Sequence, residues 1–186
     1  MTDLTKDPIV NAIHSGIKRG INVTVEKKFF GWAVVLIYSG MDTMASLNMS
    51  LGQEEVTKRD FVEWVEKYIH FPCTEQLTGL DLYGARCSTL HRYGVVSRLS
   101  KEGKCRQVGY MNHSKPEVRY NPDVSQRLVL VSVEALRDAF FKGVDRFLID
   151  VFGSGDLQKI QILEQRLKTL FQSLPHKKDT SGDAAS

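Results

Sequence analysis

Apolar residues recur at helical spacing along most of the chain, and this pattern predicts a mostly α-helical fold. Isoleucines follow Asp7-Pro8, a typical helix start, at every fourth position, and we expect this first helix to end at Gly20. A second helix is expected over about 26–48, because it contains the longest apolar run, residues 29–38. This run is about half as long as a membrane span. We therefore expect a buried core helix and no membrane association.

Two capping signals predict the next two helices. Thr57-x-x-Asp60 and Thr78-x-x-Asp81 each place a threonine before the helix and a carboxylate three residues later. The two side chains of such a pair bind each other's backbone N–H groups and so begin a helix. We therefore expect helices over 57–70 and 78–93.

The following segment has a different composition. Glycine, lysine, asparagine and proline are frequent from residue 95 to 131, and the apolar stretches 106–111 and 127–131 predict a small β-hairpin. Ser132 then caps a helix expected over 132–151, and a last helix is expected over 156–174.

These elements predict one domain over residues 1–174, a helical bundle with a small β-hairpin insertion. Residues 175–186 contain no large apolar side chain, so we expect a disordered tail. The N-terminus lacks the apolar core of a signal peptide, and the three cysteines form no C-x-x-C pair. The simplest interpretation is a cytoplasmic protein with reduced thiols.

Charge is concentrated in one segment. The formal net charge of the chain is only +3, whereas residues 92–119 hold seven basic and two acidic residues. A local basic segment suits contact with the phosphates of RNA, although a solvated basic loop remains an equal alternative. The candidate RNA-binding residues are Arg92, Arg98, Lys101, Lys104 and Arg106.

The helix expected over 78–93 carries the candidate chemistry. The stripe that we expect to face the core consists of Leu80, Tyr83, Cys87 and Leu90. Arg86 and His91 lie about 140° apart around this helix, on either side of this stripe. This separation predicts that one copy of the helix presents the two poorly as a pair. A histidine can move a proton near neutral pH, and an arginine can stabilise charge on a phosphate. Together they suit attack by a ribose 2′-hydroxyl on the adjacent phosphate, without a metal or other cofactor.

Other roles remain open for these residues. Arg86 and His91 can also be a surface arginine and a helix-terminal histidine with no catalytic function. Asp42, in an apolar run, is a candidate partner that would orient Arg86, or it faces solvent. Arg106 and His113 form a second, looser Arg–His pair, but in the irregular segment. A zinc site that includes Cys87 and His91 does not match the usual ligand spacings, so we expect no metal.

The run Leu82-Tyr83-Gly84-Ala85-Arg86-Cys87-Ser88-Thr89-Leu90-His91, with the segment 99–104 after it, resembles bacterial proteins related to the HEPN superfamily. That superfamily consists of small helical bundles, often dimeric. Many members are metal-independent ribonucleases of toxin–antitoxin, CRISPR and phage-defence systems. Their signature is Arg, four to six residues, then His, which Arg86 and His91 match.

The resemblance covers about residues 26–150 and implies an RNA-binding homodimer, with Arg86 and His91 as catalytic residues of an endoribonuclease. Asp42 and Cys87 would then support the pair, and an antitoxin or other protein could be a partner. The superfamily usually has a polar residue directly after the arginine, whereas this chain has Cys87. Some members lack activity, so the alternative is a non-catalytic interaction or nucleotide-binding module of the same fold.

Overall fold

The structure is a computed structural model that describes residues 7–112 and 115–171. The expected disordered tail, residues 175–186, and His113 of the looser Arg–His pair lie outside the described residues. Within the described part, the fold is mostly helical with a small three-stranded sheet. The predicted class, mostly α with a small β element, is therefore confirmed.

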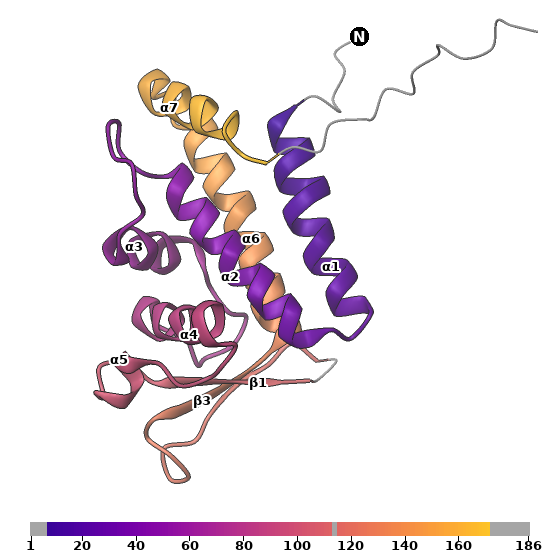
Figure 1. Cartoon of the computed structure of the whole chain (residues 1–186), viewed down its shortest axis with the longest axis vertical. Helices are drawn as coiled ribbons and strands as arrows, with labels where there is room; N and C mark the ends of the chain where they lie inside the picture. Colours follow the sequence, from indigo (N-terminus) through magenta and orange to yellow (C-terminus); the bar gives the residue numbers. More distant parts are fainter. Residues whose placement is uncertain (1–6, 113–114, 172–186) are drawn as a thin grey trace, which may run out of the picture.

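The helix α2 (Phe30–Leu47) is the centre of the molecule (Figure 1). It packs against α1 (Arg19–Glu26), α3 (Lys58–Tyr68), α4 (Gly79–Arg92) and α6 (Val133–Phe152). By length and composition α2 could cross a membrane, but half of it is buried inside the protein. Ile37, Tyr38 and Met41 are fully buried, which is typical of a core helix.

The first helix is longer than the sequence predicted. Asp7 accepts hydrogen bonds from the N–H groups of Ile9 and Val10, as expected of a helix start. A wider π-helical stretch, η2 (Ile9–Lys18), then runs directly into α1. The prediction that Gly20 ends this helix is wrong, because burial of Ile21 at 0 % exposure holds the next turns in the core.

The chain reverses between the first two helices, within the range that was predicted to begin the second. Lys28 has a left-handed backbone with φ of 61°, and the N–H of Phe29 bonds back to the carbonyl of Thr24. The central helix therefore begins at Phe30 and not at about Glu26.

The capping predictions for the next helices are confirmed. In both α3 and α4 the threonine side chain accepts from the N–H three residues on, and the aspartate accepts from the threonine N–H. Tyr93, with φ of 50°, ends α4 in a left-handed conformation. A short helix that the sequence did not predict, α5 (Arg98–Lys101), follows it.

The predicted β-hairpin is wrong. Strands β1 (Gln107–Met111) and β3 (Leu128–Ser132) do pair, but in parallel, with Val108 opposite Val129. The strand β2 (Val118–Tyr120), which was not predicted, pairs antiparallel with β3 on its other side. The sheet order among the described residues is β1-β3-β2.

The last two helices begin where the sequence indicated. Ser132 caps α6 by accepting from the N–H of Ala135, and Asp156 caps α7 (Leu157–Leu167) in the same way. The helix α7 lies at the opposite end of α6 from the sheet (Figure 1). It ends at Leu167 and not at 174, and Phe171, within the range predicted for this helix, is 89 % exposed.

Candidate functional site

The buried face of α4 differs from the predicted stripe of large apolar residues. It is made mostly of small residues, and the side chains of Leu80, Tyr83, Cys87 and Leu90 are only partly buried. A Cβ added to Gly84 would lie 2.6 Å from the Cys105 sulfur, which shows how closely the segment 97–105 packs on the helix. Small residues on this face allow such close packing, and among the larger residues of α4 Leu82 is fully buried.

Arg86 is held by a carboxylate from the central helix. Its Nε lies 2.9 Å and 3.1 Å from the two Asp42 oxygens, and its Nη2 lies 2.8 Å from Oδ2. Both side chains are 23 % exposed. Burial lowers the pKa of Arg86, but the hydrogen bond and charge of Asp42 outweigh this effect, so the pKa is raised. Asp42 thus fixes the plane of the guanidinium, which was one of the two alternatives left open by the sequence.

Arg86 reaches His91 within one chain. The Arg86 Nη1 lies 3.5 Å from the His91 Nε2, and His91 is exposed. The prediction that one copy presents the pair poorly is therefore wrong. The two side chains do leave α4 in different directions, but the arginine side chain is long enough to cross the helix surface.

The guanidinium retains donors for a ligand. Arginine carries five N–H groups and no acceptor. Asp42 takes the Nε–H and one of the two Nη2 N–H groups, while Nη1 has only long contacts that a phosphate oxygen can replace, the nearer one to His91. At 3.5 Å the two nitrogens are at the outer limit of a hydrogen bond, so the His91 ring remains able to turn toward a ligand. Cys87 lies beside them, with its sulfur 4.0 Å from Arg86 Nη1.

Four of the five candidate RNA-binding residues are available at the surface. Arg92 and Lys101 are exposed. Arg98 and Lys104 share one carboxylate, Glu102, at 3.6 Å and 2.7 Å, and their side chains are 86 % and 64 % exposed. Surface ion pairs of this kind contribute little stability, so a phosphate can replace Glu102 as their partner.

Arg106 has a structural role instead. Its Nη2 lies 2.7 Å from the Oδ2 of Asp81, which is only 2 % exposed, and it also pairs with Glu75. Its backbone N–H bonds to the other Asp81 oxygen, and its guanidinium lies over the ring of Tyr120. These partners fasten the start of β1 to the start of α4. We therefore remove Arg106 from the candidate RNA-binding residues.

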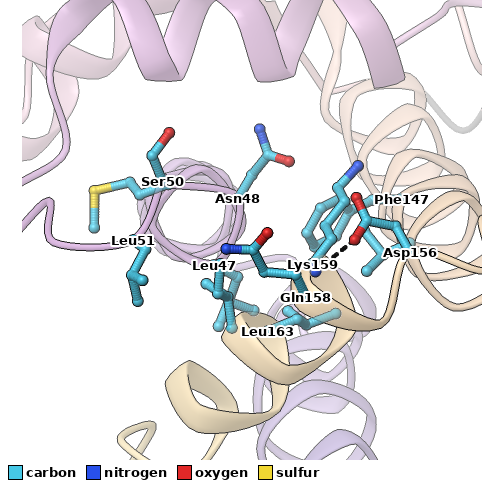
Figure 2. A pocket seen from close by; sticks show the side chains of 12 residues that line it. Leu47, Asn48, Ser50, Leu51, Phe147, Asp156, Gln158, Lys159 and Leu163 are labelled. Carbon is cyan, nitrogen blue, oxygen red and sulfur yellow. Dashed lines mark hydrogen bonds between the residues drawn. The ribbon is translucent and has the colours of Figure 1, made fainter.

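A hollow of about 280 Å³ lies at the far end of α2 (Figure 2). Leu47, Phe147 and Leu163 line it together with polar residues that follow α2 and that begin α7. The dashed line in Figure 2 is the capping bond from the Lys159 N–H to Asp156. None of the buried side-chain atoms that lack a hydrogen bond in the described residues belongs to this hollow. We assign no function to it.

No group of three histidine, cysteine or acidic side chains within residues 7–112 and 115–171 is arranged to hold a metal ion. The chain matches no protein-family model, no curated protein and no solved structure in the comparisons with known proteins.

Proposed function

We propose that this chain is a HEPN-like RNA-binding protein that cleaves RNA without a metal ion and acts as a homodimer. The observation that supports this proposal is the array of Asp42, Arg86 and His91. An exposed histidine lies next to an oriented guanidinium that still has free donors, and the exposed basic residues follow directly after this helix in the chain.

In the proposed reaction, the unprotonated His91 removes the proton from a ribose 2′-hydroxyl. The resulting oxygen attacks the adjacent phosphorus, and Arg86 stabilises the negative charge that develops on the phosphate oxygens. The bond to the 5′-oxygen then breaks, which leaves a 2′,3′-cyclic phosphate and a 5′-hydroxyl. Asp42 does not contact the substrate in this mechanism, and it acts by holding Arg86.

This reaction also explains why a dimer is proposed. One proton leaves the 2′-hydroxyl and another must reach the departing 5′-oxygen, so two acid–base groups are useful. A second copy would supply its own His91 to the same cleft. The dimer is not required to bring Arg86 to His91, because one chain already does this. We expect the mass in solution, measured by light scattering, to be twice that of the chain.

The test is incubation of the purified full chain with single-stranded RNA in EDTA. We expect cleavage products that end in a 2′,3′-cyclic phosphate, which mass spectrometry identifies. RNA that is bound but remains intact would refute the catalytic part and favour the second candidate, a non-catalytic RNA-binding module. Cys87 is the observation that favours this second candidate, because a half-buried thiol stands beside the arginine where the superfamily usually has a polar residue.

The basic segment gives a separate prediction on binding. The RNA affinity should fall steeply as salt concentration rises, because each phosphate contact releases counterions. We expect Lys101→Ala combined with Lys104→Ala to reduce the slope of log affinity against log salt by about 1.4, since each contact with a single strand contributes about 0.7. The control is Lys142→Ala combined with Lys168→Ala, two exposed lysines elsewhere, which should leave the slope unchanged. Equal slopes for both double variants would exclude these contacts.

A further inference from the structure

A second cavity lies between the start of α2 and the end of α4. Its volume is about 200 Å³, and Phe30, Val34 and Val133 form apolar walls. Cavities that hold drug-sized ligands are larger, at about 300–1,000 Å³. The cavity therefore suits a single small ring system, and nothing in the mechanism above uses it.

One polar group of the cavity is buried without a donor. Thr89 lines the cavity at 6 % exposure, and no group donates a hydrogen bond of regular geometry to its hydroxyl oxygen. The nearby Tyr110 hydroxyl donates its proton to the Tyr38 hydroxyl at 2.9 Å, so toward Thr89 it can only accept. A buried acceptor without a donor is costly, and a ligand that offers an N–H group would satisfy it.

Two exposed aromatic side chains lie at the edge of this cavity. Tyr93 lines it and is 61 % exposed, and its ring centre lies 5.7 Å from that of Trp32, which is also 61 % exposed. The left-handed backbone of Tyr93 brings its hydroxyl against Gly31, where an added Cβ would lie 1.9 Å from it. Any side chain at position 31 would therefore displace Tyr93 from the cavity.

We infer that this cavity receives one unpaired base of the RNA, stacked on Tyr93 and hydrogen-bonded by the Thr89 hydroxyl. The inference rests on the proposed function and names a part of its substrate. A base is a small flat ring system whose edge carries donors and acceptors, and bases stack on aromatic side chains. Tyr93 follows His91 by two residues, so the cavity lies at the same end of α4 as the candidate catalytic histidine. The Thr89 oxygen is free to accept, so a base whose edge carries an amino group suits the cavity.

The test compares two probes that the protein cannot cut by this mechanism. One is an oligoadenylate of eight nucleotides with 2′-O-methyl groups, and the other is the same backbone without bases. We expect the first to bind about tenfold more tightly, as one base–aromatic stack allows. Binding should also quench the emission of Trp32, while Trp64, at 1 % exposure, gives a constant background.

Two substitutions locate the effect. Tyr93→Leu should remove the preference for the probe with bases and leave the affinity for the abasic probe unchanged. Thr89→Val keeps the shape of the side chain and should lower the affinity for the probe with bases by about threefold, with no change for the abasic probe. Phe171→Leu, at an aromatic residue that is 89 % exposed, is the control and should change neither.

The outcomes separate this inference from the proposed function. Cleavage in EDTA without any preference for bases would overturn the base site and leave the proposed function standing. A preference for bases that Tyr93→Leu removes, without cleavage, would support the base site and refute catalysis. If Tyr93→Leu changes the mass in solution and not the preference, the cavity holds a second copy of the chain and the inference is wrong.

Discussion

His91→Ala is expected to lower the rate of RNA cleavage in EDTA by at least about 100-fold, which is the usual contribution of a general acid–base group. His91 is exposed, so its replacement should leave the fold intact. The affinity for uncleaved RNA should change little, because the basic residues and Arg86 remain. The measurement is the single-turnover cleavage rate of a labelled RNA, with circular dichroism to confirm folding.

The matched control is His70→Ala, which removes an exposed histidine from the loop after α3. Its cleavage rate should equal that of the unmodified chain, which also excludes a contaminating nuclease as the source of activity. Equal rates for His91→Ala and His70→Ala would show that His91 has no catalytic role.

A third variant tests the positioning role of Asp42. Asp42→Asn keeps the shape of the side chain but removes the charge that holds Arg86. We expect an intermediate loss of rate, because the guanidinium remains but is free to turn away from His91. Since Asp42 acts through Arg86, the combination of Asp42→Asn with Arg86→Lys should be no slower than Arg86→Lys alone.

Local signals in the sequence predicted most helix starts. The boxes at Thr57 and Thr78 and the cap at Ser132 act through bonds between residues three apart, so they are visible in the sequence. The pairing of β1 with β3 depends on residues about 20 positions apart. The apolar stretches showed that two strands exist, but not that their pairing is parallel.

The same distinction applies to the candidate site. The spacing of Arg86 and His91 gave the correct directions from the helix axis, but not the reach of a long side chain held by Asp42, 44 positions earlier. Arg106 appeared in the sequence as one more positive charge. Its carboxylate partner, Asp81, lies 25 positions earlier. The capping box already gave that carboxylate a role, so the sequence offered no reason to expect a second partner. Tertiary partners such as these leave no local pattern.

Asp81 is the residue whose loss should destabilise the fold most clearly. Its carboxylate caps α4 through the N–H of Thr78 and also binds the backbone and guanidinium of Arg106. We expect Asp81→Ala to lower the free energy of unfolding by about 3 kcal/mol, the lower end for a broken buried ion pair, because the Arg106 side chain is 21 % exposed. The measurement is urea unfolding, followed by the fluorescence of the buried Trp64.

The control is an ion pair at the surface. Glu102→Ala removes the partner of Lys104, whose side chain is 64 % exposed, and should change the free energy of unfolding little. Asp81→Asn keeps an oxygen for the capping bond but leaves the Arg106 charge with Glu75 alone, so its loss should lie between the other two. If Asp81→Ala were as mild as Glu102→Ala, the connection between α4 and β1 would not depend on this pair, and Arg106 would again be a candidate for binding phosphate.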